Sequence, residues 1–311
     1  MEGLVVKSTG SWYEVETSQK ERIQARLKGK FRIKGLKSTN PLAVGDRVKF
    51  EMEGEEGVIH TIEDRKNYII RKSINLSKQV QIIAANVDCL FLIITIENPV
   101  TTLGFVDRFL VGAEAYRIPT VLVYNKLDLL TTEKQEKDLA RWKEIYKSAG
   151  YEQLEVVATE EKGIDKLKEL MKGKISIFSG NSGVGKSTLI NSLDSNFDLR
   201  VNKISDAHQT GQHTTTFAEL FELPFGGKII DTPGIKGFGN VELDREVLSH
   251  YFPEMREKIN DCKFNNCVHI NEPNCAIKEA VAKGEIAKTR YLNYLSIFEE
   301  EEGESYRTKG Y

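Results

Sequence analysis

The 311-residue chain has few cysteines and no long run of apolar residues. Three of its four cysteines fall within 14 residues, which is unlike a disulfide framework and suits a metal in a reducing compartment. The longest apolar run, at residues 89–96, is too short to cross a bilayer. The amino-terminal residues lack the charged and then apolar pattern of a signal peptide. These absences predict a cytoplasmic protein with no membrane partner.

Positive charge is concentrated near the front of the chain, although the formal net charge is only −2. Residues 1–72 hold 15 Lys and Arg against 11 Asp and Glu, and residues 20–37 hold eight against one. Separated charge of this kind fits a polyanionic partner such as RNA. A solvated strand face explains the same composition equally well, so both interpretations stay open at this point.

Three segments with different patterns divide the chain. Residues 1–72 hold five short alternating stretches separated by polar turns, which predicts a small β-barrel such as an OB-fold. Residues 73–234 alternate buried-strand runs with helical stretches, which predicts an α/β domain with a largely parallel sheet. Residues 235–311 have helical periodicity on both sides of the cysteine cluster, which predicts a helical domain.

The stretch FSGNSGVGKST at residues 178–188 matches the phosphate-binding pattern G-x-x-x-x-G-K-[ST], between a strand run and a helical stretch. Glycines let the backbone turn tightly, so its N–H groups and the helix N-terminus can surround phosphate oxygens. Lys186 would place its charge between the β- and γ-phosphates, and Ser187 would offer a hydroxyl to Mg²⁺. The predicted phosphate-site residues are Ser179, Gly180, Asn181, Ser182, Gly183, Val184, Gly185, Lys186, Ser187 and Thr188.

Two further elements of a nucleoside triphosphatase follow this loop. DTPG at residues 231–234 ends an apolar strand run, so Asp231 can hold the Mg²⁺ shell and the Gly234 N–H can meet the γ-phosphate. Between the two lies GQHTTTF, at residues 211–217. We expect Thr215 to complete the magnesium shell when the γ-phosphate is present. The predicted cofactor of this site is Mg²⁺, bound together with the nucleotide.

The element NKLD at residues 125–128 predicts that the base is guanine. The Asp128 carboxylate can accept from the ring N–H and the exocyclic amine of guanine together, a pair of donors that adenine lacks on that edge. Asn125 can bond the base and neighbouring loops, and the Lys126 stem can cover the ring face. A second turn, at residues 156–164, offers backbone N–H groups to the guanine oxygen. The predicted base-site residues are Asn125, Lys126, Leu127, Asp128, Ala158 and Thr159.

The order of these elements is unusual. The base-reading element and the base turn precede the phosphate loop, whereas GTPases normally begin with the phosphate loop. The same cyclic series has been cut between DTPG and NKLD. A circular permutation preserves packing when the original termini lie close together and the new cut falls in a tolerant connection. The sequence therefore predicts a circularly permuted GTPase domain that retains all five elements.

The clustered cysteines form the pattern C-x4-C-x-H-x5-C from Cys262, Cys267, His269 and Cys275. Three thiolates and one imidazole suit a tetrahedral zinc ion. No fifth ligand or nearby base suggests an open catalytic position, so one structural zinc per chain is expected. The alternative is three reduced cysteines beside a surface histidine. Cys89 lies within an apolar strand run and is expected to be an ordinary core residue.

One residue that many GTPases use is missing. The position after the DTPG glycine, where a glutamine commonly orients the attacking water, is Ile235 here. His213, beside the switch threonines, is the candidate replacement, because a neutral imidazole can orient water or accept its proton. A solvent-facing loop histidine is an equally good interpretation. The predicted catalytic set is therefore Lys186, Thr215 and His213.

Taken together, these motifs resemble the RsgA (YjeQ/YloQ) family, circularly permuted GTPases that assist small-ribosomal-subunit assembly. The matching pieces are NKLD, GNSGVGKST, GQHTTT, DTPGI, VDRFLV, CKFNNCVHINEPNC and the amino-terminal GLVVKS, GKFR and GDRV. The resemblance implies an OB-fold, a permuted GTPase domain and a zinc-bearing helical domain. It also implies hydrolysis of GTP to GDP stimulated by the 30S subunit, with 16S rRNA as a partner, and it supports His213 as the water-positioning residue.

Two other function classes compete with this interpretation. The chain could be a zinc-containing RNA-binding scaffold whose guanine nucleotide site only gates affinity. A P-loop kinase is disfavoured by NKLD and by the lack of an evident Arg-rich lid. Turnover of GTP with and without 30S particles separates the first two classes. We expect the protein to be a monomer.

Overall fold

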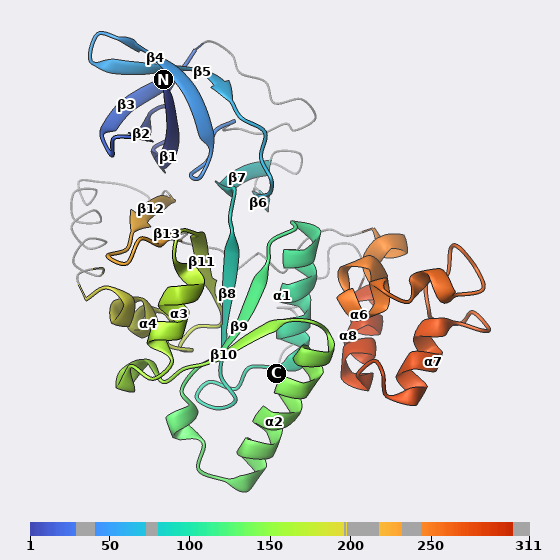
Figure 1. Cartoon of the computed structure of the whole chain (residues 1–311). Coiled ribbons are helices and arrows are strands. Elements are labelled where there is room, and N and C mark those ends of the chain that lie inside the picture. The colour runs from blue at the N-terminus through green and yellow to red at the C-terminus, as the bar shows by residue number, and fades with distance from the viewer. Residues whose placement is uncertain (29–40, 73–79, 196, 198–217, 232–243, 301–311) are drawn as a thin grey trace. The chain divides into compact units, whose positions relative to one another are not determined.

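The computed structural model describes residues 1–28, 41–72, 80–195, 197, 218–231 and 244–300 (Figure 1). The chain forms two compact units, and each is assembled from separated segments. The first contains Met1–Phe91, Ala158–Ser179 and residues from Lys186 onward to 235. The second contains Leu92–Val157, Gly180–Gly185 and the carboxy-terminal residues from 236.

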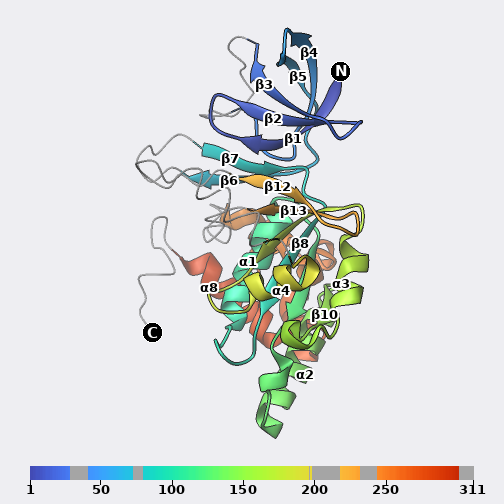
Figure 2. The same cartoon turned by 90° about the vertical axis from the view of Figure 1, so that its left-hand side faces the viewer.

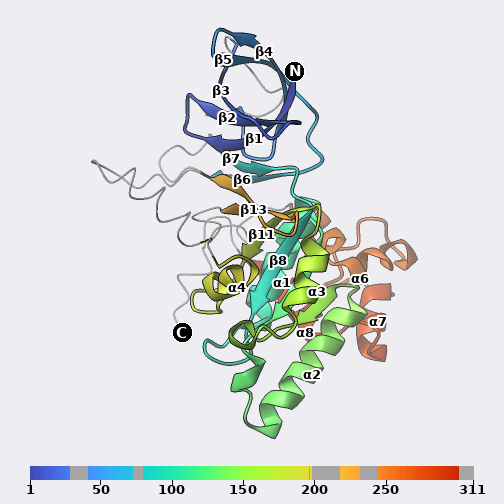
Figure 3. The same cartoon turned by 60° about the vertical axis from the view of Figure 1, so that its left-hand side comes forward.

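The amino-terminal strands of the first unit close into a five-stranded barrel, which Figure 3 shows nearly end-on. The strands are β1 (Glu2–Ser8), β2 (Tyr13–Thr17), β3 (Arg22–Leu27), β4 (Arg47–Glu53) and β5 (Glu56–Ile62). Their order is β1-β2-β3-β5-β4, β3 and β5 are parallel, and β4 returns to pair with β1. The alternating apolar residues, such as Val15, Phe50 and Ile59, are fully buried inside. The prediction of a small OB-type barrel is confirmed.

The positive charges at the start of the basic stretch are engaged in ion pairs. Lys20 pairs with Glu222, Arg22 with Glu14, and Arg26 with the acidic residues of the β4–β5 hairpin. These partners favour the interpretation of a solvated strand face for residues 20–26. The remaining positive charges beyond residue 28 lie outside the described residues.

A short hairpin follows the barrel. Its strands β6 (Tyr68–Lys72) and β7 (Val80–Ala85) form a separate two-stranded antiparallel sheet, which the sequence patterns did not predict. The expected domain boundary after residue 72 falls between these two strands. That boundary and the one after residue 234 remain predictions.

The rest of the first unit carries the strands that lead to the phosphate loop and to DTPG. Strand β11 (Ile175–Ser179) is parallel to β13 (Lys228–Asp231), and β12 (Glu219–Glu222) is antiparallel to β13. Strand β12 also pairs with β1, so the sheet continues into the barrel. Helices α3 (Ile164–Met171) and α4 (Lys186–Leu193) lie side by side (Figure 2).

The second unit contains the base-reading part of the α/β fold. Strand β9 (Thr120–Tyr124) lies between β8 (Cys89–Ile94) and β10 (Glu152–Glu155) in the sheet, and β9 and β10 are parallel. Every residue of β8 is buried, as its apolar run predicts. Helix α1 (Leu103–Ala115) begins at its N-cap Thr102, and α2 (Glu133–Ser148) begins with a capping box at Thr132.

The carboxy-terminal part of the same unit is helical, as predicted. The stretch before the cysteine cluster forms three short helices, η4 (Arg245–Tyr251), α6 (Pro253–Arg256) and η5 (Ile259–Asp261). Pro253 disfavours a helical conformation at the preceding Phe252, which is extended, and then starts α6. Gly284, with φ of 79°, separates α7 (Ala276–Lys283) from α8 (Lys288–Glu299).

Helices α8 and η4 pack on α1. The apolar core of this region includes Val111, Phe252, Ile277 and Tyr294. Among the described residues, no helix is long and apolar enough to span a membrane.

Candidate functional site: a nucleotide-binding loop pair and a metal centre

The base-reading loop follows β9 and is bonded to the phosphate loop. Asn125 is buried, and its backbone N–H donates to the Ile94 carbonyl. Its side-chain Nδ2 donates to the Val184 carbonyl at 2.9 Å. The short helix η1 (Leu127–Leu129) then presents Asp128, which is exposed. Its exposed carboxylate is accessible to a ligand.

The phosphate loop can take this path only because three of its residues are glycines. Gly180, Gly183 and Gly185 have φ angles of 146°, 82° and 94°, which L side chains rarely adopt. A Cβ on Gly180 would lie 2.3 Å from the Ile93 carbonyl oxygen, and one on Gly185 would lie 2.4 Å from Asn125 Nδ2. The close approach of the two loops requires glycine at these positions.

Lys126 joins the phosphate loop to a third segment. The backbone of Lys126 is left-handed, with φ of 62°, and its Nζ donates to the Gly183 and Asn98 carbonyls at 2.7 Å each. A Cβ built on Gly183 would lie 3.6 Å from Pro99 Cδ. The sequence reasoning missed the role of Asn98, because the bonded atom is a backbone oxygen. The only signal was an Asn-Pro turn directly after a buried strand.

The second base-turn candidates lie in the first unit. Ala158 is buried and Thr159 follows it in η2 (Ala158–Glu160), which packs against α4. Helix α4 begins at Lys186, which is half-buried, and Ser187 and Thr188 in its first turn are exposed. This arrangement leaves the hydroxyls of the first turn accessible.

Asp231 lies at the carboxyl end of β13. Because β13 is parallel to β11, the strand that ends in Ser179, both strands finish at the same edge of the sheet. Burial, together with the nearby Glu219 carboxylate, raises the pKa of Asp231. A bound cation would stabilise the charged carboxylate there. The predicted switch residues His213, Thr215 and Gly234 lie outside the described residues.

The four predicted metal ligands come together. Their ligand atoms all lie within 4.8 Å of one another. Cys262 Sγ and Cys275 Sγ lie 3.6 and 3.4 Å from His269 Nδ1, and the two sulfur atoms are 4.0 Å apart. Around a tetrahedral ion with bonds of about 2.3 Å to sulfur and about 2.0 Å to nitrogen, the sulfur–nitrogen and sulfur–sulfur edges would measure about 3.5 and about 3.8 Å. The donor set therefore fits a tetrahedral metal.

The surroundings of this cluster also suit a metal. Burial raises the pKa of the Cys267 thiol to about 12 and lowers the pKa of the His269 imidazole. A neutral imidazole is the form that binds metal, and a nearby cation would favour the thiolate. The loop is held in place by Tyr291 and Tyr294, whose hydroxyls donate to the His269 and Val268 carbonyls. Cys89 lies apart in buried strand β8, as predicted.

Strand β11, the glycine loop and α4 follow one another in the chain, and the NKLD loop, which precedes them, is bonded to the backbone of the glycine loop. This fold and loop pair define a circularly permuted P-loop GTPase. A model of the RsgA GTPase family matches residues 62–241, and a model of the RsgA N-terminal domain matches residues 2–59. The chain belongs to the RsgA GTPase family.

Full-length relatives support this assignment. A curated protein of Flavobacterium johnsoniae named "Small ribosomal subunit biogenesis GTPase RsgA" is 54% identical, with 100% of this chain and 96% of that protein covered. One of the same name from Christiangramia forsetii is 55% identical, with 100% and 99% covered.

Two solved structures also support the assignment to this family. YjeQ from Thermotoga maritima superposes with a TM-score of 0.79 at 38% identity, covering 98% of this chain and 99% of that one. YloQ, described as a circularly permuted GTPase, gives 0.76 at 30% identity, covering 96% and 93%. The predicted fold class is confirmed.

Proposed function

We propose that the chain is a GTPase that binds the small (30S) ribosomal subunit and acts in its late assembly, converting GTP and water to GDP and phosphate. The observation that carries this proposal is the direct bonding of the NKLD loop to the phosphate loop, through Asn125 to Val184 and Lys126 to Gly183. The names of the curated relatives support the ribosomal partner.

The base is selected by the exposed Asp128 carboxylate. It accepts from two guanine donors at once, while Asn125 holds the loop and the Lys126 stem covers the ring. The backbone N–H groups of Ala158 and Thr159 are assigned to the guanine oxygen. Adenine offers no matching pair of donors on that edge, so this loop discriminates against ATP.

The phosphates are held by the loop of residues 179–188, whose glycines bring backbone N–H groups close to a ligand. Lys186 is assigned to the β- and γ-phosphates, Ser187 and Thr215 to Mg²⁺, and Asp231 to the magnesium shell. Bound magnesium would neutralise charge on the phosphate oxygens. Gly234 is assigned to the γ-phosphate through its N–H. His213 is assigned to the attacking water, since Ile235 cannot orient it.

Three further assignments complete the proposal. The barrel, residues 1–72, is an RNA-binding domain that contacts 16S rRNA, followed by the permuted GTPase domain at 73–234 and the zinc-binding domain at 235–311. The protein acts in the cytoplasm, where ribosomes assemble. It works as a monomer, without a membrane partner.

We expect purified protein to contain about one zinc ion per chain, held by the Cys3His cluster. Replacing Cys267 with serine should remove the zinc and unfold the carboxy-terminal helices first, because the binding free energy of a structural zinc is folding free energy. Elemental analysis and limited proteolysis measure both effects. Cys89→Ala is the matched control and should keep its zinc, because Cys89 lies apart in β8. A zinc-free parent protein would refute the assignment.

We expect GTP turnover to rise at least tenfold when 30S subunits are added and to stay unchanged with 50S subunits. His213→Ala should bind GTP normally but lose most of the stimulated turnover, because the water is no longer oriented. Phosphate release under multiple-turnover conditions measures both. Nucleotide-dependent 30S binding without turnover would instead favour the scaffold whose nucleotide only gates affinity. Full turnover in the His213 variant would make that residue an ordinary loop histidine.

A further inference from the structure

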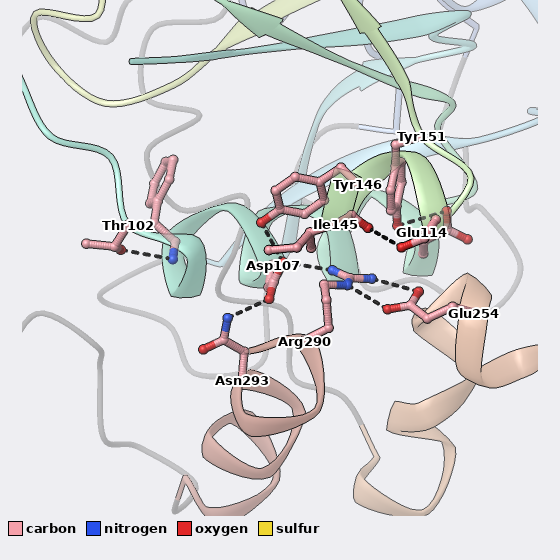
Figure 4. Close-up of polar contacts among 11 residues, drawn as sticks. Thr102, Asp107, Glu114, Ile145, Tyr146, Tyr151, Glu254, Arg290 and Asn293 are labelled. Atoms are coloured by element: carbon pink, nitrogen blue, oxygen red, sulfur yellow. Dashed lines mark hydrogen bonds and ion pairs between the residues drawn. The ribbon is translucent and has the colours of Figure 1, made fainter. Parts of the chain in front are cut away.

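A buried ionic cluster joins the carboxy-terminal helices to the base-reading part of the fold (Figure 4). The guanidinium of Arg290, on α8, lies between Asp107 of α1 and Glu254 of α6. Its Nη1 donates to Asp107 at 2.8 Å, and its Nε and Nη2 donate to Glu254 at 2.6 and 3.0 Å. Asp107 also accepts from the Tyr146 hydroxyl and the Asn293 amide. The side chains of Arg290 and Asp107 are each only 1% exposed.

This cluster can be satisfied in only one docked position. Aromatic rings surround the guanidinium, with Phe252 at 4.7 Å, Tyr146 at 5.7 Å and Tyr151 at 5.8 Å from its centre. Water is therefore excluded, and a small displacement would leave buried charges without partners. The bidentate pair with Glu254 adds geometric selectivity. Arg290 thus fixes the position of α8 against α1 and α6.

The docked helix α1 starts from the loop of residues 95–102. Gly104, in the first turn of α1, faces Asn293 of α8, with a Cβ-to-Oδ1 distance of 3.6 Å if a Cβ is built. The Thr102 side chain caps the same turn. The loop is closed by bonds from the Thr95 N–H to Thr101 Oγ1 and from the Thr95 hydroxyl to the Pro99 carbonyl. A shift of α1 would therefore move this closed loop.

The same loop holds the phosphate loop. Lys126 Nζ bridges the Asn98 and Gly183 carbonyls, and Pro99 packs near Gly183. A continuous set of contacts thus leads from Arg290, through α1 and the loop of residues 95–102, to the backbone that is assigned to the nucleotide phosphates. All of its members belong to one compact unit.

We propose that Arg290 is a positioning residue for the nucleotide site, so that docking of the carboxy-terminal helices and binding of guanine nucleotide strengthen each other. The proposal rests on the guanine-nucleotide site proposed above. Linkage requires the effect to be reciprocal: if docking favours GDP binding, GDP must favour docking by the same factor.

The first test measures GDP affinity with a fluorescent GDP analogue. Arg290→Met should weaken GDP binding about tenfold, because Asp107 and Glu254 lose their shared partner and α1 is no longer held. Arg290→Lys keeps the charge but cannot pair with both carboxylates as Arg290 does, so an intermediate loss is expected. Arg256→Met is the matched control. Arg256 also joins the carboxy-terminal helices to α1, through Glu114, but it is half exposed, so GDP affinity should stay within twofold of the parent.

The second test separates positioning from a purely structural role. Amide hydrogen exchange along residues 288–299 should slow about tenfold when GDP is added to the parent protein. The same GDP effect should persist in Arg256→Met and disappear in Arg290→Met. A residue that only stabilised the fold would change exchange equally with and without GDP.

Either of two results would overturn the proposal: unchanged GDP affinity in a folded Arg290→Met protein, or α8 exchange in the parent that does not respond to GDP. If Arg290→Met does not fold, the exchange experiment on the parent protein still tests whether GDP binding and docking of α8 are linked. A parent protein that binds ADP as tightly as GDP would refute the guanine site itself, and that result is obtained without any variant.

Discussion

Replacing Asp128 with asparagine should convert the chain from a guanine-selective to a xanthine-selective nucleotide binder. Guanine presents an N–H and an amine to the carboxylate, whereas xanthine presents a carbonyl where guanine has the amine, and an amide NH₂ can meet that carbonyl. Hydrogen bonds to a charged group contribute about 1.5–3 kcal/mol, so the affinity for GTP should fall about 10- to 150-fold. Competition of GTP and xanthosine triphosphate for a labelled nucleotide measures the change.

The matched control for this variant is Glu136→Gln. It makes the same change from acid to amide at an exposed position in the first turn of α2, and it should leave the guanine preference intact. Unchanged preference for guanine in the Asp128→Asn protein would remove the base-reading role from NKLD. It would leave the phosphate-loop assignment untouched, because that assignment depends on different residues.

Replacing Gly185 with alanine should abolish nucleotide binding, with at least about a 100-fold loss of GDP affinity. The new Cβ would lie 2.4 Å from Asn125 Nδ2, and the φ of +94° is unfavourable for any L side chain. Since Asn125 Nδ2 donates to the Val184 carbonyl, relieving the clash breaks the bond between the two loops. Equilibrium titration with a fluorescent GDP analogue measures the loss.

Gly150→Ala provides the control for backbone strain alone. Gly150 has a similar φ of +85°, but a Cβ there meets nothing within 4 Å. We expect this variant to lose about 1 kcal/mol of stability while its GDP affinity is unchanged. If Gly185→Ala binds GDP as well as Gly150→Ala does, the close approach of the two loops is not needed for binding.

The sequence by itself predicted the chemistry of the molecule. The glycine loop, NKLD and the Cys3His cluster are local patterns in which the residue type dictates what can be bound. The permuted order could also be predicted from the sequence, because it depends only on where these motifs stand along the chain. The barrel strands followed from the alternation of apolar and polar residues, since period 2 is itself the geometry of a strand.

Local patterns were insufficient where residues outside a segment determine its structure or its contacts. Helical periodicity predicted helical structure before the cysteine cluster but not where it is interrupted, and Pro253 and the packing of Phe252 in the core divide it into short pieces. The basic charge of residues 20–37 suggested a polyanion site as readily as a solvated face, and only the structure shows that Lys20, Arg22 and Arg26 pair with acidic residues.

Only the tertiary structure shows which residues from distant segments contact one another. Arg290 and Asp107 are 183 residues apart in the sequence, and nothing in either segment indicates that the other is its partner. The Asn98 and Gly183 carbonyls that Lys126 joins are backbone atoms, so no side-chain pattern reveals them. A motif specifies which groups can bind a ligand, whereas the pairing of buried charges and backbone oxygens depends on which surfaces meet when the chain folds.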